Sequence, residues 1–176
     1  YYKLVEDSVV EPITFYSDEG KRIYARTLKL IFLKACYDLS LNMNKIEFTN
    51  KIQNNYFIRF KQQVDEDLIE DIREKMWNII MYNIRITKHK LSYEGARKVY
   101  KSLGSEHQLD NFRIKTKDNY TFYECDNYYN YLYGLVAPTT GYITNFEIKP
   151  YKDGAILFLP DDDNIDKINT EVISNN

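Results

Sequence analysis

The sequence predicts an α+β fold, in which antiparallel strands form a sheet that is covered by helices. Three stretches repeat apolar residues every three or four positions, as helices with one buried face do. Much of the remaining chain alternates apolar and polar residues in short runs that turn residues separate, as antiparallel strands do. With 176 residues, the chain is long enough for one sizeable core, or for one core and a small appendage.

A first helix is expected from about residue 21 to residue 39, after a turn-like segment at residues 17–20. Its apolar positions step by three and four and therefore share one face: Tyr24, Leu28, Ile31, Ala35 and Leu39. Two strands follow at residues 46–48 and 56–60, around an asparagine-rich turn at Asn54-Asn55.

A second helix is expected over residues 65–82, because acidic residues 65–67 crowd its first turn, where the helix dipole favours them. Its predicted buried stripe is Leu68, Ile72, Met76, Ile79 and either Tyr82 or Ile80. A short strand at residues 84–89 leads to a third helix, which Ser92 caps and Gly104 ends in a left-handed conformation. The inward residues of this helix are Ala96, Val99, Tyr100 and Leu103.

The rest of the chain is predicted to be β-structure. Residues 112–114 and 120–124 are expected to form one hairpin, and residues 143–148 and 155–159 a second. The α+β domain is therefore expected to span residues 13–160. Residues 1–12 are the expected tail of a preceding domain or a linker, and the acidic residues 161–176 are an expected linker.

Composition and charge argue against several classes of function. A net charge of −2 argues against a general nucleic-acid binder, and no DNA partner is expected. The longest apolar run, residues 155–160, is far too short to cross a bilayer, so no membrane partner is expected. Cys36 and Cys125 are interpreted as buried free thiols of a cytoplasmic protein. The two histidines, His89 and His107, have no metal-ligand spacing with either cysteine.

Two distant segments carry a resemblance to a known family. The first runs from Asp18-Glu-Gly to Ala-Arg-Thr-Leu28, and the second runs from Tyr131-Leu-Tyr-Gly through Pro138-Thr-Thr-Gly-Tyr142 to Pro160. Order and spacing over about residues 13–160 resemble the editing domain, or second additional domain, of threonyl-tRNA synthetases; the same fold is shared with alanyl-tRNA synthetases.

In that family, a His-x-x-x-His pair and a later Cys and His help to hold a metal ion. The aligned residues here are Gly20, Tyr24, Leu132 and Val136. Because all four positions lack ligand chemistry, the resemblance implies that neither a metal nor metal-dependent deacylation is retained.

The same segments resemble more closely the form of this domain that precedes the kinase core in some bacterial nucleoside kinases of the uridine kinase type. The resemblance implies an accessory or regulatory module without a catalytic site or cofactor of its own. It further implies a downstream kinase domain that uses ATP and Mg, and an upstream ubiquitin-like (TGS-like) domain. These residues alone contain no Gly-x4-Gly-Lys-Ser/Thr phosphate loop and no Gly-x-Gly-x-x-Gly.

The candidate pocket residues lie in the two resembling segments: Gly20, Arg22, Tyr24, Arg26, Leu132, Tyr133, Gly134, Val136, Thr140, Gly141 and Tyr142. One hypothesis is that the Tyr24 ring fills the space of the lost metal site. The other is that it lines, with Tyr133 and Tyr142, a retained pocket for a nucleobase or ribose.

Arg22 and Arg26 lie one helical turn apart, where they could hold a phosphate or a tRNA backbone, or could serve as structural residues at a domain interface. The alternative function is an RNA- or tRNA-binding module, with or without residual deacylation of aminoacyl-tRNA.

Overall fold

The computed structural model describes residues 14–49, 51–112 and 119–171, and it confirms the α+β class. Its strands are all antiparallel, and they form two sheets where the sequence predicted one. The four-stranded sheet has the order β1 (Glu47–Phe48), β2 (Tyr56–Arg59), β7 (Gly154–Phe158) and β6 (Glu147–Tyr151). The three-stranded sheet has the order β3 (Ile86–Leu91), β4 (Tyr120–Cys125) and β5 (Tyr128–Tyr131).

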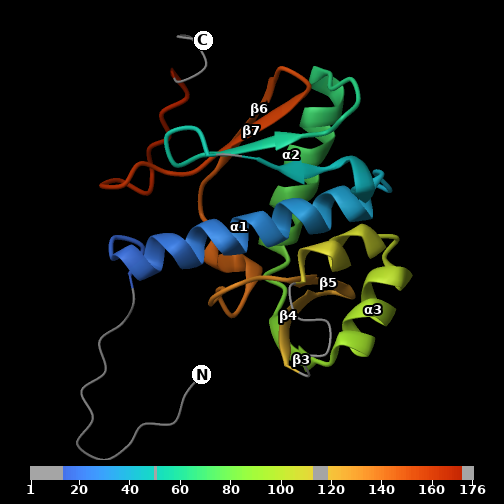
Figure 1. The fold of residues 1–176 in the computed structure, drawn as a ribbon. Coiled ribbons are helices and arrows are strands. Elements are labelled where there is room, and N and C mark those ends of the chain that lie inside the picture. Colours follow the sequence, from blue (N-terminus) through green and yellow to red (C-terminus); the bar gives the residue numbers. More distant parts are fainter. Residues whose placement is uncertain (1–13, 50, 113–118, 172–176) are drawn as a thin grey trace, which may run out of the picture.

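The first helix, α1 (Asp18–Asp38), crosses the molecule between the two sheets (Figure 1). It begins three residues earlier than predicted, because the Ser17 hydroxyl accepts a hydrogen bond from the Gly20 N–H and caps the helix. The predicted single apolar face was too narrow. Residues 30–36 are all buried, which covers every side of the helix, as expected for a helix enclosed by protein.

The second helix, α2 (Glu66–Met81), packs against α1 and β6. Its N-cap is Asp65, whose carboxylate accepts a hydrogen bond from the Leu68 N–H at 2.8 Å. The predicted stripe is confirmed at Ile72, Met76 and Ile79, and Ile80 rather than Tyr82 completes it, since Tyr82 is 80% exposed. Leu68 is only partly buried against the core. The buried residues of α2 are Ile69, Ile72, Met76, Ile79 and Ile80.

The third helix, α3 (Tyr93–Ser102), begins and ends as predicted. The Ser92 hydroxyl accepts a hydrogen bond from the Gly95 N–H, and Gly104 has a φ of +68°. Together with the short helix η2 (Glu106–Asn111), α3 covers a second, smaller apolar cluster: Ala96, Tyr100, Leu109, Phe112, Tyr120 and Phe122.

One predicted hairpin is confirmed, and the other falls largely outside the described residues. β4 pairs with β3 along one edge and, over residues 122–125, with β5 along the other. Phe112 instead ends η2 and stacks on Tyr120 with ring centroids 4.3 Å apart, and residues 113 and 114 lie outside the described residues. β6 and β7 form the expected hairpin across residues 152–153.

Two further short helices are present, η1 (Met43–Lys45) and η3 (Thr140–Tyr142). The predicted tail at residues 1–12 lies outside the described part of the chain. Within residues 14–49, 51–112 and 119–171, no helix combines the length and the apolar character needed to cross a bilayer.

Gly154 provides a test of the four-stranded sheet, because β7 pairs there with β2 and β6 at once. A Cβ at this position would stand 1.8 Å from the backbone oxygen of Ile58, which cannot move without disturbing the sheet. We expect Gly154→Ala to lower the free energy of unfolding by about 1–3 kcal/mol, measured by urea denaturation followed by circular dichroism.

Gly95→Ala is the matched control, because the new Cβ would meet only side-chain atoms at 3.4 Å or more. Alanine is also the better helix former, so this variant should keep or gain stability. Equal losses in the two variants would contradict the proposed close approach at Gly154.

Candidate functional site

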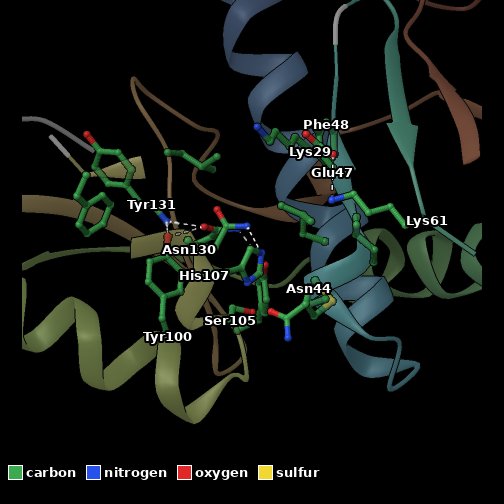
Figure 2. Close-up of a pocket in the computed structure, with 17 residues that line it drawn as sticks. Lys29, Asn44, Glu47, Phe48, Lys61, Tyr100, Ser105, His107, Asn130 and Tyr131 are labelled. Carbon is green, nitrogen blue, oxygen red and sulfur yellow. Dashed lines mark hydrogen bonds and ion pairs between the residues drawn. The ribbon is translucent and has the colours of Figure 1, made fainter. Parts of the chain in front are cut away.

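A cavity of about 430 Å³ lies between α1 and the three-stranded sheet (Figure 2). One side is lined by α1, η1, β1 and Lys61, and the other by α3, η2, β5 and the residues that flank them. Figure 2 shows the two groups of labelled side chains on opposite sides of the opening. The volume lies within the range of small-molecule sites, which is about 300–1,000 Å³.

The wall formed by β5 is fixed by hydrogen bonds around Asn130 (Figure 2). The side-chain oxygen of Asn130 accepts hydrogen bonds from the Tyr100 hydroxyl at 2.9 Å and from the Tyr131 N–H at 2.8 Å. Its amide nitrogen donates to the Tyr128 hydroxyl at 3.0 Å. Burial raises the pKa of Tyr100 and of Tyr128, so both phenols stay protonated at neutral pH. The wall is therefore polar, neutral and held in one arrangement.

The opposite wall carries the charged groups. The Lys29 ammonium lies 4.6 Å from the centroid of the Phe48 ring, and the Lys61 ammonium lies 3.2 Å from the Glu47 carboxylate. His107 faces them from η2, and partial burial lowers its pKa, an effect that Asp110 opposes. His107 is therefore mainly neutral at pH 7 and can donate one hydrogen bond and accept another.

The residues of this cavity suit binding better than covalent chemistry. They supply hydroxyls, amides, aromatic rings and two ammonium groups. Cys36 and Cys125 are both fully buried, and burial raises the pKa of Cys125 to about 12, so neither thiol is an available nucleophile at neutral pH. Within the described residues, no three His, Cys, Asp or Glu side chains are grouped as metal ligands would be.

The two segments that carry the resemblance, residues 18–28 and 131–160, do lie together, but the contact between them is part of the core. Tyr24 is completely buried, and its hydroxyl donates to the Asn145 carbonyl and accepts from the Asn145 N–H at 2.9 Å. The Tyr142 ring is a neighbour, with ring centroids 6.0 Å apart, whereas Tyr133 is 87% exposed. The phenol of Tyr24 is thus occupied by the backbone of the second segment.

The four positions at which the resemblance implies metal ligands do not fit a metal ion. A Cβ at Gly20 would stand 1.7 Å from the Thr14 carbonyl oxygen, so no side chain can extend from that position without moving the backbone. Tyr24 is engaged as described, Leu132 is buried in the main apolar core, and Val136 packs against it. The site is filled by apolar side chains and a hydrogen-bonded phenol.

Arg26 holds the loop that follows β5, whereas Arg22 pairs within its own helix. The guanidinium of Arg26 donates to the Leu135 carbonyl at 3.0 Å and lies against Gly134, whose φ is +113°. Arg22 is more exposed and pairs with Glu19 at 2.9 Å.

The candidates at η3 serve the backbone. The hydroxyl of Thr140, which is completely buried, donates to the Ile79 carbonyl and accepts from the Ile84 N–H. The Gly141 N–H donates to the Asn83 side chain at 3.1 Å. These contacts are structural.

Of the eleven candidate residues, Leu132 is the one that lines the cavity of Figure 2. The sequence analysis missed its other main residues, Lys29, Asn130, Tyr131 and His107, as site residues. Two of these residues stand out in the sequence. Lys29 is a charged residue among the apolar positions of the first helix, and Asn130 interrupts a run of tyrosines.

Comparison with known proteins identifies relatives of the chain. No protein-family model matches it. It is 26% identical over 143 residues to the threonine–tRNA ligase of Clostridium kluyveri, and 28% identical over 145 residues to that of Caldanaerobacter subterraneus subsp. tengcongensis. It is 20% identical over 148 residues to the threonine–tRNA ligase of Syntrophotalea carbinolica.

The first two matches cover 80% of this chain and 22% of each ligase, and the third covers 82% and 23%. The chain therefore spans less than a quarter of the length of these relatives. It is homologous to one region of them, and the observed α+β fold agrees with the resemblance to a threonyl-tRNA synthetase editing domain.

Tyr24 provides a test of how the two segments are joined. Tyr24→Phe keeps the ring but leaves the Asn145 carbonyl and N–H without their buried partner. We expect the free energy of unfolding to fall by about 1–3 kcal/mol, measured by urea denaturation.

Tyr142→Phe is the control, since it removes a hydroxyl from the neighbouring ring, which is only partly buried. This change should alter stability by less than about 0.5 kcal/mol. A Tyr24→Phe variant as stable as the control would show that the phenol contributes nothing to the contact.

Proposed function

We propose that the chain is a metal-independent, editing-domain-like binding module, and that it serves as an accessory domain of an ATP-dependent nucleoside kinase of the uridine kinase type. The observation that carries the binding role is the cavity of Figure 2, whose polar walls are fixed by hydrogen bonds. The four aligned metal-ligand positions do not fit a metal ion, so the proposed binding does not depend on one. The two-segment resemblance supports the kinase context. In this proposal, the ATP and Mg belong to a kinase domain outside these residues.

The walls of the cavity suit a nucleoside. Phe112 and Tyr131, whose ring centroids are 5.1 Å apart, supply aromatic surface against which a base can pack. Asn44, Ser105 and His107 supply hydrogen-bonding groups to the same cavity. A nucleoside has a planar base that can pack against the aromatic rings, and sugar hydroxyls that can bond to the polar side chains. It therefore matches both features of the cavity.

The module would act by binding rather than by hydrolysis. Fold similarity alone does not transfer an activity when the residues that perform it have changed. The proposed role is therefore to hold a nucleoside-containing ligand and to influence the adjoining kinase domain, with an upstream TGS-like domain as a further neighbour.

The homology to threonine–tRNA ligases supports a second candidate, an RNA- or tRNA-binding module with or without residual deacylation. This role requires binding of tRNA that weakens as salt rises. Filter binding at low salt discriminates between the candidates, since the absence of tRNA binding there would remove the second one. Deacylation of mischarged tRNA at the background rate would remove its hydrolytic form.

A blocking substitution tests nucleoside binding. Asn44 is exposed and lines the cavity, so the indole of Asn44→Trp would occupy the opening without disturbing the core. We expect uridine or adenosine to shift the amide NMR signals of cavity residues such as Asn130. Asn44→Trp should weaken this binding by about tenfold or more, equivalent to 1.4 kcal/mol.

The control is Lys45→Trp, the neighbouring exposed position, which does not line the cavity. It should bind nucleosides like the unmodified chain. If neither nucleoside binds the unmodified chain at millimolar concentration, the binding role is wrong.

The kinase context is tested in the full-length parent protein. We expect it to transfer phosphate from ATP to a nucleoside, and we expect Asn44→Trp, but not Lys45→Trp, to change the KM or the response to product. A full-length protein that phosphorylates no nucleoside would overturn this part of the proposal, and it would leave the binding role to be judged on the cavity alone.

A further inference from the structure

Two lysines lie beside one aromatic pair at the edge of the cavity. The Lys29 ammonium is 4.6 Å from the Phe48 ring centroid, and the Lys51 ammonium is 5.5 Å from the Tyr56 ring centroid. The Phe48 and Tyr56 rings meet edge to face with centroids 5.2 Å apart. The two lysines therefore each contact one ring of the same aromatic pair.

Glu47, which lines the cavity together with Lys29, pairs with Lys61 at 3.2 Å. The carboxylates that line the second cavity with Lys51 are Asp18, Asp161, Asp162 and Asp163, and none of these four described residues forms an ion pair with it. Within the part of the chain that the structure describes, neither Lys29 nor Lys51 takes part in an ion pair. Lys34 on the same helix provides the contrast, since its ammonium lies 2.8 Å from the Asp38 carboxylate.

The two ammonium groups repel each other. Burial lowers the pKa of Lys29, and the charge of Lys51 lowers it further. Arg26 adds positive charge to the same region, because its guanidinium opposes the rise to about 12 that burial causes in the pKa of Tyr56. Like charges without a counterion are unfavourable, and an anion placed between them removes the repulsion.

The position of the pair connects it to the cavity. Lys29 and Phe48 line the cavity of Figure 2. Lys51 lines a second cavity of about 720 Å³, together with Arg22 and Asp161. The two lysines thus stand at the edges of two cavities, and the Phe48 and Tyr56 rings in contact with each other join those edges.

We propose that Lys29 and Lys51 bind the phosphate of a nucleotide whose nucleoside part occupies the cavity of Figure 2. This inference rests on the proposed nucleoside-binding role and adds the class of ligand. The oxygens of a phosphate accept hydrogen bonds from both ammonium groups, and its negative charge neutralises them. The phosphate belongs either to a free nucleoside monophosphate or to the end of an RNA strand.

A free monophosphate would give the module a regulatory meaning. A nucleoside kinase moves the terminal phosphoryl group of ATP to a nucleoside hydroxyl, so that ADP and a nucleoside monophosphate leave. A site that prefers the phosphorylated form would distinguish the product of that reaction from its substrate.

Calorimetric titration of the chain with uridine, adenosine, their 5′-monophosphates and a short RNA oligonucleotide tests the inference. We expect each monophosphate to bind about tenfold tighter than its nucleoside, and this gain to fall as salt rises. Lys51→Gln, at a residue that does not line the nucleoside cavity, should remove most of the gain and leave nucleoside binding unchanged. Lys29→Gln should also remove most of the gain. Lys45→Gln, at an exposed lysine that lines neither cavity, should keep the gain.

The outcomes separate the two proposals. If a nucleoside and its monophosphate bind equally to the folded chain, the phosphate site is wrong and nucleoside binding stands. If neither binds, the proposed binding role is wrong. Inorganic phosphate that binds the unmodified chain but neither lysine variant would then still support the lysine site. Tighter binding of the monophosphate than of the oligonucleotide identifies a free nucleotide, and the reverse order identifies an RNA end.

Discussion

Burial of α1 between the two sheets is the constraint on which the rest of the structure depends. Leu28, Ile31 and Phe32 are completely buried, and complete burial of such a side chain contributes about 1.5–3 kcal/mol. Because one helix packs against both sheets, neither half of the main core is complete without it (Figure 1). The same burial favours a partner inside the protein for the polar groups that are buried on the helix. Thr27 and Lys34 show the consequence: the Thr27 hydroxyl accepts from the Ala137 N–H, and the Lys34 ammonium donates to the Asp126 carbonyl.

These polar contacts attach the loops of the molecule to α1 and so shape the site. In the family that the chain resembles, a metal ion joins the first helix to the segment that matches residues 132–146. In this chain the contact is made by the Tyr24 phenol, the Thr27 hydroxyl and the Arg26 guanidinium. Hydrogen bonds to backbone groups fix the segment in one position without any ion. The residues at the aligned ligand positions therefore form a closed, well-packed contact.

The sequence predicted those features that depend on neighbouring residues. Helix caps such as Ser92 and Gly104, the middle of the α2 stripe and the hairpin of β6 and β7 are local, and each is present as predicted. The two-sheet arrangement was missed because β2 pairs with β7, about a hundred residues further along the chain, and period-two patterns do not identify distant partners. The all-round burial of α1 was missed because a one-face pattern was fitted to a continuous apolar run. The cavity was missed for a similar reason, since its lining comes from at least six separate elements.

Leu132 is where the aligned ligand positions and the cavity meet, and on the proposed function it explains why binding does not require metal ligands. It stands at an aligned ligand position, it is buried in the main core, and it also lines the cavity. An apolar side chain there removes a metal ligand but does not fill the cavity, because the walls are set by α1 on one side and by the Asn130 hydrogen bonds on the other. Binding surface and reactive groups are therefore separable in this fold, and a change at the four ligand positions can remove a reaction while the surrounding walls remain. On the proposed function, such a domain keeps its value to a larger protein as a recognition module.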